Sequence, residues 1–111
     1  MDRLTHYKNL VRTALDEIAQ DFSRSDWKII KAYDETRGQY LLFTDNWKGS
    51  SRQYGCFMHL EVNPNGKIYL HRDGTDLDIG QQLLDEGVPK SDMVIGFHSP
   101  AMRAMTDFAQ S

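Results

Sequence analysis

The chain has 111 residues, of which 40% are hydrophobic and 26% charged, and its formal net charge is −3. This composition excludes a disordered tail, a coiled coil and a collagen-like repeat. No apolar run approaches the roughly 18 residues needed to span a bilayer, and the charged start of the chain is unlike a signal peptide. We therefore expect one domain over residues 1–111 with no membrane association. The single cysteine, Cys56, cannot form an internal disulfide, which favours a cytoplasmic location.

The two halves of the chain differ in charge. Residues 1–55 carry nine Lys/Arg and eight Asp/Glu, whereas residues 56–111 carry four and eight. A nucleic-acid-binding domain commonly shows a basic face and a pI above about 9, but the pI here is about 5.7. Direct DNA binding is therefore disfavoured, and a protein partner is favoured.

Residues 2–20 are predicted to form an amphipathic helix with Asp2 as its N-cap, followed by a polar connection over residues 21–26. The prediction rests on apolar residues that recur at helical spacing. These residues are Leu4, Tyr7, Val11, Ala14, Leu15 and Ile18.

Residues 26–33 and 39–47 are predicted strands of a first hairpin, joined by the loop Asp34–Gly38. We expect a register in which paired residue numbers sum to 72. One face then holds Ile30, Ala32, Tyr40 and Leu42, and the other holds Trp27, Ile29, Tyr33, Leu41 and Phe43. Short helices cannot cover both faces, so we expect an aromatic-rich patch that is exposed or buried by another chain. Trp27 and Phe43 are accordingly candidate partner-binding residues.

Residues 52–63 and 67–72 are predicted strands of a second hairpin. Asn63-Pro64-Asn65-Gly66 suits a type I turn in which Gly66 takes the left-handed conformation. Paired numbers then sum to 130, which puts apolar residues on one face and largely polar ones on the other. The first set is Met58, Leu60, Val62, Ile68 and Leu70, and the second is Phe57, His59, Glu61, Tyr69, His71 and Asp73.

The rest of the chain is predicted to contain a helix over 77–86 that ends at Gly87, a buried extended stretch over 93–97, and a short helix opened by Ser99-Pro100. The expected fold class is therefore α+β. It consists of an N-terminal helix, a four-stranded antiparallel sheet of two hairpins, and short C-terminal helices.

His59 and His71 face one another in the predicted second hairpin. Two imidazoles at this spacing can share a metal, with Glu61 and Asp73 as further ligands. The competing interpretation is an exposed polar sheet face without a ligand. Cys56 is predicted to be a small buried core residue, not a nucleophile. The sequence contains no phosphate-binding loop, CxxC or dinucleotide fingerprint, and we predict no cofactor.

A second polar group lies near the C-terminus. Ser99 is better suited to capping the last helix than to acting as a nucleophile beside His98. We expect Arg103 to clamp this turn through backbone carbonyls or an acidic neighbour, with Asp92 and Asp73 as candidates. The alternative is that His98, Ser99 and Arg103 contact a partner.

The stretches Tyr54-Gly55-Cys56 and His71-Arg72-Asp73-Gly74-Thr75, followed by GVPKxDxVxGFHSPxxR over residues 87–103, occur in this order. With the closing Thr106-x-Phe108-Ala109, the chain resembles the XisI family, whose members come largely from cyanobacteria. The resemblance covers nearly the whole chain.

The resemblance implies a controlling factor for excision of a DNA element by a site-specific recombinase. The family takes its name from the factor required, together with a companion called XisH, for excision of the fdxN element. XisH-like proteins resemble restriction-type nucleases. We therefore expect a non-catalytic regulatory protein that acts through protein contacts. The expected partner is an XisH-like protein, and a homo-oligomer is compatible with this role. The alternatives are a small metal-dependent enzyme that uses His59 and His71, and a DNA-binding accessory factor.

Overall fold

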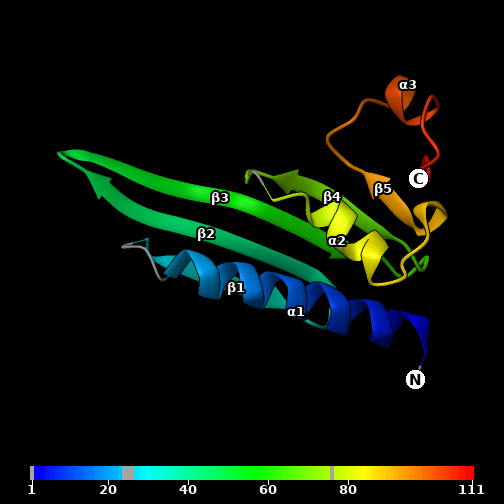
Figure 1. The fold of residues 1–111 in the computed structure, drawn as a ribbon, viewed down its shortest axis with the longest axis horizontal. Helices are drawn as coiled ribbons and strands as arrows, with labels where there is room; N and C mark the ends of the chain where they lie inside the picture. The colour runs from blue at the N-terminus through cyan, green and yellow to red at the C-terminus, as the bar shows by residue number, and fades with distance from the viewer. Residues whose placement is uncertain (1, 24–26, 76) are drawn as a thin grey trace.

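The computed structural model describes residues 2–23, 27–75 and 77–111. The fold is α+β, with two helices packed on one face of a five-stranded sheet (Figure 1). In chain order the elements are α1 (Arg3–Ser23), β1 (Ile29–Asp34), β2 (Gln39–Lys48), β3 (Ser51–Val62), β4 (Ile68–Asp73), α2 (Ile79–Asp85), a 3₁₀ turn (Lys90–Asp92), β5 (Met93–Ile95) and α3 (Pro100–Arg103).

The sheet has one strand more than predicted. Its order is β1-β2-β3-β4-β5, and β5 pairs with β4 in parallel. The expectation of a purely antiparallel, four-stranded sheet is therefore wrong. The apolar run at 93–95 becomes a strand because α2 carries the chain back along the sheet, so that β5 enters in the same direction as β4.

The helix α1 begins where the sequence predicts and ends three residues later, at Ser23. Its Asp2 cap is confirmed, since the backbone N–H of Thr5 donates to Asp2 Oδ1 at 2.8 Å. Part of the predicted connection, residues 24–26, lies outside the described residues. The buried side of α1 consists of Tyr7, Val11, Leu15, Ile18 and Ala19.

The register of the first hairpin differs by one residue from the prediction. Asp34 pairs with Gln39 and Ile30 with Phe43, so paired numbers sum to 73. The reason is the loop. Asp34 stays in the strand and its side chain accepts the Arg37 backbone N–H, which leaves a four-residue connection. A one-residue shift turns every side chain of one strand to the other face. Tyr40 and Leu42 therefore share the helix-covered face with Ile29 and Tyr33, not with Ile30 and Ala32.

The second hairpin follows the prediction from Val62 to Leu60. Gly66 has φ +85°, Leu60 pairs with Leu70, and all five predicted core residues of this hairpin are buried. Beyond Leu60 the register shifts by one residue, so that His59 pairs with Arg72 and not with His71. The local twist that accompanies such a bulge still leaves the two histidine rings with centroids 4.6 Å apart.

A further irregularity separates Cys56 from the core. The register between β2 and β3 shifts at Leu42/Phe43, so Leu42 pairs with Met58 and Phe43 with Cys56. The extra residue, Phe57, stacks on Phe22 of α1, on the helix-covered face. Two predictions are wrong here: Phe57 does not share the face of His59, and Cys56 is only half-buried. A bulge reverses the alternation that both predictions assumed.

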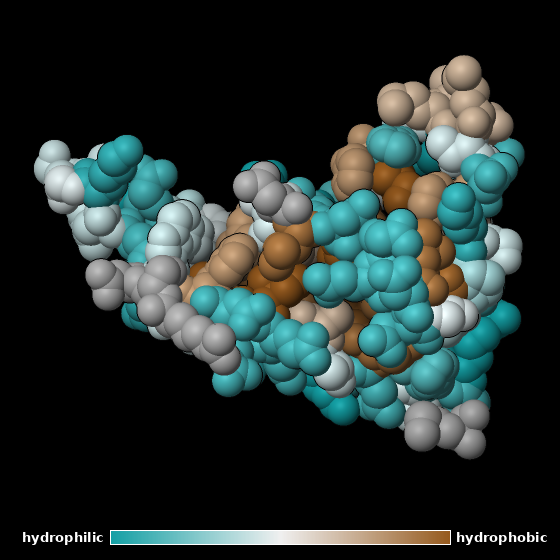
Figure 2. Space-filling model, viewed as in Figure 1, coloured by the Kyte–Doolittle hydropathy of each residue, from teal (hydrophilic) through white to brown (hydrophobic). Residues whose placement is uncertain are grey.

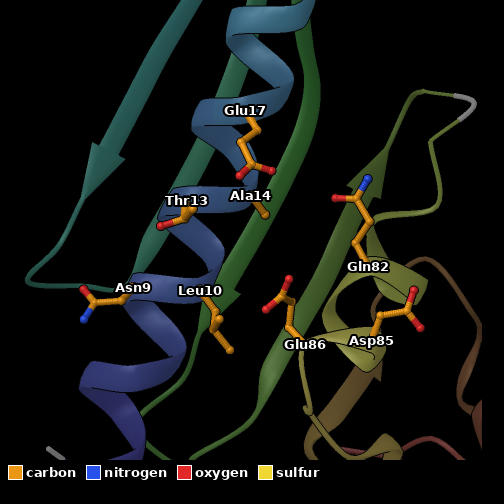
Figure 3. A pocket seen from close by; sticks show the side chains of 8 residues that line it. All are labelled: Asn9, Leu10, Thr13, Ala14, Glu17, Gln82, Asp85 and Glu86. Carbon is orange, nitrogen blue, oxygen red and sulfur yellow. The ribbon is translucent and has the colours of Figure 1, made fainter.

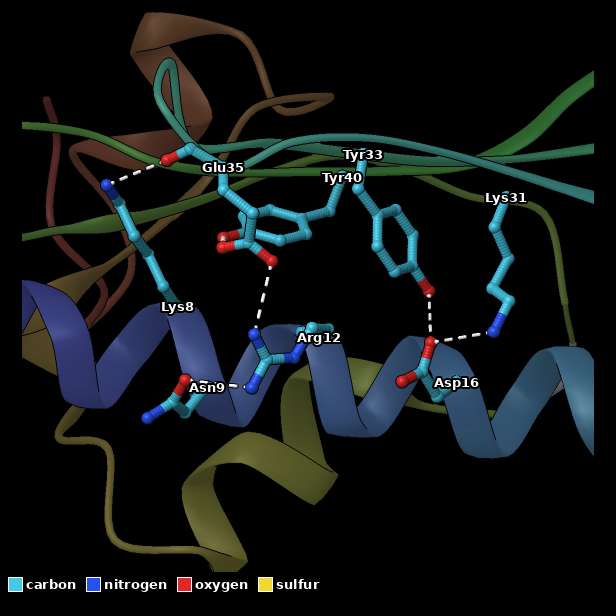
Figure 4. Close-up of polar contacts among 8 residues, drawn as sticks. All are labelled: Lys8, Asn9, Arg12, Asp16, Lys31, Tyr33, Glu35 and Tyr40. Carbon is cyan, nitrogen blue, oxygen red and sulfur yellow. Dashed lines mark hydrogen bonds and ion pairs between the residues drawn. The ribbon is translucent and has the colours of Figure 1, made fainter.

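Polar contacts fix α1 to the first hairpin (Figure 4). The Tyr33 hydroxyl donates to Asp16 at 2.9 Å, and Lys8 donates to the backbone carbonyl of Glu35 at 2.9 Å. Burial, followed by the bond to Asp16, raises the pKa of Tyr33. The hydroxyl therefore stays protonated as a donor, and it sets the position of the helix on the strands.

The distal halves of β2 and β3 extend past both helices as an arm, defined here as residues 43–56 (Figures 1 and 2). Beyond Thr44, where the pairing with β1 ends, the arm is two-stranded. None of these residues is buried. The arm ends in a two-residue turn between Lys48 and Ser51, with Gly49 at φ +63° as a type II′ turn requires. The arm gives the molecule its longest dimension, 43 Å.

Candidate functional site

The face of the sheet away from α1 and α2, called the open face here, carries the first candidate surface. Ile30 pairs with Phe43, and Phe43 pairs with Cys56 and contacts the Tyr54 ring at 6.3 Å. Ile30 is 36% exposed and Tyr54 59%. An apolar group that crosses three strands without cover is typical of a contact surface. We call Ile30, Phe43 and Tyr54 the open-face patch.

A charged pair borders this patch. Arg52 donates two hydrogen bonds to Asp45, from Nε at 2.8 Å and from Nη2 at 3.0 Å, and its guanidinium lies 4.4 Å from the centre of the Tyr54 ring. These contacts hold Tyr54 in place on the arm. A fixed tyrosine beside an arginine is the type of group that dominates protein–protein binding energies.

The polar half of the open face is built around the two histidines. His59 Nε2 lies 2.7 Å from Gln39 Oε1, and His71 Nε2 lies 2.8 Å from Glu61 Oε1. Glu61 also accepts a bond from Asn63 at 2.9 Å. The two rings contact one another directly, with centroids 4.6 Å apart and their planes tilted by 38°.

The environment opposes a positive charge on His59. Burial lowers its pKa, and the nearby His71 lowers it further. Burial by itself raises the pKa of Glu61, but the hydrogen bonds from His71 and Asn63 outweigh this effect and the net pKa is lowered. The group therefore contains an ionised carboxylate beside His71 and a neutral imidazole at His59 near pH 7.

The structure does not assemble the ligand set that the metal hypothesis needs. Asp73 turns away from the histidines: its Oδ1 accepts the Thr75 hydroxyl at 2.7 Å, and its Oδ2 accepts the Ile79 N–H at 3.3 Å. Within residues 2–23, 27–75 and 77–111, no group of three or more His, Cys, Asp or Glu side chains is arranged to hold a metal ion.

A second candidate surface is a groove beside the outer part of the arm, next to the residues that lead into β1. Its volume is about 490 Å³, and it is lined by Trp27, Asn46, Trp47, Lys48 and Gln53. Asn46 and Gln53 pair directly across β2 and β3, so both lie on the face opposite Phe43. Trp27 is 51% exposed and Trp47 67%. We call this the arm groove.

A groove between α1 and α2 is lined mostly by polar and acidic residues, together with Leu10 and Ala14 (Figure 3). It has a volume of about 350 Å³, and Glu17 on α1 and Glu86 after α2 point toward one another across it. Acidic side chains at such a helix junction are well solvated and need no ligand. This groove therefore provides no specific chemistry.

The C-terminal turn is a structural unit. Arg103 donates to three backbone carbonyls: from Nη2 to Gly96 at 3.0 Å, from Nε to Ile95 at 3.3 Å and from Nη1 to Gln110 at 3.5 Å. Ser99 caps α3 by accepting the Met102 N–H at 3.2 Å. The predicted clamp is confirmed in its carbonyl form, and neither Asp92 nor Asp73 takes part.

His98 lies in this turn with its backbone N–H bonded to the Ile95 carbonyl at 3.0 Å. Its Nδ1 is buried and has no hydrogen-bond partner among the described residues. The ring lies edge-on to Phe97, with centroids 5.1 Å apart. Since Ser99 is used as a cap, the pair has the geometry of a turn and not of a nucleophile and its base.

The residues predicted to bind a partner therefore fall into three separate places. Phe43 lies on the open face and Trp27 on the arm groove, so the prediction that they share a face is wrong; the cause is the hairpin register. His98, Ser99 and Arg103 lie together near α3, at the end of the molecule opposite the arm (Figure 1).

The sequence patterns did not predict the arm itself or the exposure of Trp47 and Tyr54. The available signal was strand length. The predicted strands over 39–47 and 52–63 are longer than the flanking strand over 67–72, so their distal ends lack neighbours on that side.

None of the helices in the described part of the chain has the length and apolar composition of a membrane-spanning segment.

The comparisons with known proteins agree with this geometry. The model of the XisI protein family matches residues 1–110. The crystal structure of the fdxN element excision controlling factor XisI from Anabaena variabilis ATCC 29413 is 33% identical to this chain, with a TM-score of 0.82, over 99% of this chain and 100% of that one. A XisI-like protein from the same organism is also 33% identical, with a TM-score of 0.87, over 96% and 97%. A comparison with curated proteins finds no match.

Proposed function

Because the chain belongs to the XisI family, we propose that it is a non-catalytic factor that controls excision of a DNA element by binding an XisH-like protein. The observation that carries the proposal is its similarity over 99% of its length to a structure named as the fdxN element excision controlling factor. The pI of about 5.7 supports action through a protein more than through DNA.

The open-face patch is the surface we assign to the XisH-like partner. It presents Ile30 on β1, and Phe43 and Tyr54 on the arm, whose strands continue into the part of the sheet that the helices cover; Arg52 lies at its edge. Aromatic and arginine side chains on a rigid support lose little entropy on binding. The polar half of the open face, with His59 and His71, then lies at the rim of the contact.

The test is co-purification and titration of the chain with an XisH-like protein. Ile30→Ser with Tyr54→Ala should weaken binding by at least about 30-fold, because central aromatic anchors dominate interfaces. Gln20→Ala, an exposed change on α1, is the matched control and should leave binding unchanged. Circular dichroism checks that each variant is folded. Unaltered binding by the folded double variant would refute this assignment.

The enzyme alternative is tested on His59 and His71. On our proposal, His59→Ala with His71→Ala leaves partner binding and excision largely intact and changes stability only modestly. Metal analysis of the purified protein accompanies this test. If the folded variant with both substitutions loses a bound metal together with its function, the protein is a metal-dependent enzyme and our proposal is wrong.

The DNA alternative is tested by a mobility shift at several salt concentrations. Binding to phosphates must weaken steeply as salt rises. On our proposal the chain alone produces no such salt-dependent shift. A steep salt dependence with the chain alone would identify it as a DNA-binding accessory factor.

A further inference from the structure

The outer edge of β3 in the arm has no strand beside it in the described part of the chain. β3 pairs with β4 only from Met58 to Val62, and the next contact on that side is the Gly74 N–H, which donates to the Phe57 carbonyl at 2.6 Å. Residues 51–56 therefore pair with β2 alone among the described residues. Figure 1 shows the arm extending past the end of β4. This stretch is a free sheet edge.

The other sheet edges are covered or carry a charge that opposes pairing. On the β2 side of the arm, the Asp45 N–H donates to the Lys28 carbonyl at 3.2 Å. At β5, the Ala109 N–H donates to the Met93 carbonyl at 2.8 Å, so the C-terminal residues lie along that edge. β1 carries Lys31 in its middle, and lysine on an edge strand disfavours pairing with another chain. The free edge of β3 has no such cover.

The arm turn determines which backbone groups of this edge are free. In a two-residue hairpin the residues that flank the turn, here Lys48 and Ser51, form a hydrogen-bonded pair. Hydrogen-bonded and non-hydrogen-bonded pairs alternate, so Arg52 and Tyr54 point their N–H and C=O groups away from β2. Asp45, opposite Tyr54, fits this alternation because its own N–H points outward from the ribbon. Such a row of groups is a template for another strand.

A second copy of the same edge is the strand that fits this template. Antiparallel pairing of a strand with its own copy has a two-fold axis, so the contact is closed. With Gln53 on the axis, Arg52 pairs with the second copy's Tyr54 and Tyr54 with the second copy's Arg52. The free groups of both residues are then used in both chains. The charge of Arg52 is neutralised within its own chain by Asp45, 2.8 Å away.

Other registers of this pairing conflict with groups in the structure. A shift of one residue aligns the free groups with groups already bonded to β2. A shift of two residues in one direction places the second copy's Ser51 beside Phe57, where Gly74 already lies. The same shift in the other direction places the two copies of Arg52 directly opposite one another, and like charges in that position are destabilising.

We propose that the chain forms a two-fold dimer in which the free edges of β3, residues 51–56, pair antiparallel about Gln53 and join the two sheets into one. Two ribbons that are each marginally stable alone become a four-stranded sheet, and three or more strands are what independent stability requires. The axis is perpendicular to the sheet, so the open-face patches of both copies lie on the same side and stay uncovered. The dimer therefore does not depend on the proposed XisH-like partner.

Disulfide trapping tests the register. The two copies of Gln53 form a non-hydrogen-bonded pair on the axis, with Cα atoms about 4.5 Å apart, which a disulfide can span. Under mild oxidation Gln53→Cys should give a covalent dimer on a non-reducing gel. Lys48→Cys, also exposed at the arm tip but on β2, is the matched control and should stay monomeric on the gel, as should wild type with Cys56 alone. Equal trapping of Gln53→Cys and Lys48→Cys would overturn the arrangement.

Analytical ultracentrifugation over a concentration series tests the hydrogen bonding. Wild type should be dimeric. Tyr54→Pro removes an outward N–H that the β2 ladder does not use, so the chain should fold but its dissociation constant should rise at least about 100-fold. Tyr54→Val keeps the N–H and a high strand propensity, and should stay within about 10-fold of wild type. Circular dichroism checks folding. A monomeric wild type, or equal effects of the two substitutions, would overturn the proposal.

The open-face patch supplies the control for the place of the interface. Ile30→Ser changes that patch on β1, away from the edge of β3, and should leave the dimer unchanged. A loss of partner binding without a loss of the dimer then concerns the proposed function alone. Loss of the dimer in Ile30→Ser would place the contact between copies on the open face and would overturn the pairing of edges.

Discussion

The helix-covered body and the arm are parts of the same two strands with opposite environments. In the body, Tyr40, Leu42, Met58 and Leu60 are fully buried against α1 and its neighbours. In the arm, Asp45, Trp47 and Tyr54 continue the same strands with no residue buried. The pairing between β2 and β3 runs through both regions. Backbone pairing alone therefore does not distinguish them, and the difference lies in what covers the side chains.

The body therefore contains the packed side chains that stabilise the fold, and the arm presents an exposed surface. An isolated two-stranded ribbon is marginally stable in water. The arm persists because it is a continuation of strands that the body holds rigid, so its exposed aromatic residues contribute little to folding and are available for binding.

The largest expected difference between the two regions comes from truncating one apolar side chain in each. Leu60→Ala should destabilise the protein by about 3 kcal/mol, because it removes a fully buried side chain from the core. Trp47, in the arm, is 67% exposed. Trp47→Ala should therefore change the free energy of unfolding by less than about 0.5 kcal/mol. Urea unfolding measures both. Equal losses would show that arm and body fold as one packed unit.

The clamp of Arg103 tests whether the C-terminal turn belongs to the body. Arg103→Ala should cost about 2 kcal/mol, since charged hydrogen bonds to three carbonyls are lost. Arg103→Lys should recover only part of this, because a single ammonium group cannot reach all three acceptors. The measurement is the urea midpoint. An unchanged midpoint in Arg103→Ala would show that the clamp does not stabilise the fold, and contact with a partner would then be the remaining role for Arg103.

The two hairpin glycines compare body and arm directly. Gly66→Ala should cost about 1 kcal/mol or more, because φ is +85° and an added Cβ would meet the Arg3 guanidinium. Gly49 also has positive φ, at +63°, but no atom lies within 4 Å of its Cβ position. Gly49→Ala should speed hydrogen exchange in the arm and leave the global midpoint unchanged. A global loss in Gly49→Ala would make the arm part of the cooperative unit.

Much of the fold follows from local chemistry that the sequence displays. The cap at Asp2, the Asn63–Gly66 turn and the Ser99 cap each depend on residues within a few positions of one another. The parallel strand β5 does not, because a short apolar run carries no information on which strand it will pair with.

The candidate site was harder to predict because it depends on which face of the sheet each strand residue occupies. One residue in the first hairpin loop decides whether Trp27 shares a face with Phe43, and one bulge decides whether Cys56 is in the core. Both events shift alternation by a single residue. The patterns of apolar residues in this hairpin fit either register, since both faces of β2 carry large side chains.

The smallest expected effect is a pH dependence that arises on the polar half of the open face. Burial lowers the pKa of His59 in the folded protein, so the unfolded chain binds the proton more readily. Stability from a neutral His59 is therefore present above the unfolded pKa of about 6.5 and decreases as the pH falls below it.

The urea midpoint should be lower at pH 5.5 than at pH 7.5, and His59→Gln should reduce that difference. His6→Gln, at an exposed position on α1, is the control and should keep the wild-type dependence. Glu61, whose pKa is lowered, adds a separate loss only at still lower pH, below its unfolded value of about 4.5. A pH dependence that is identical in His59→Gln and wild type would show that the imidazole is not held neutral by the sheet.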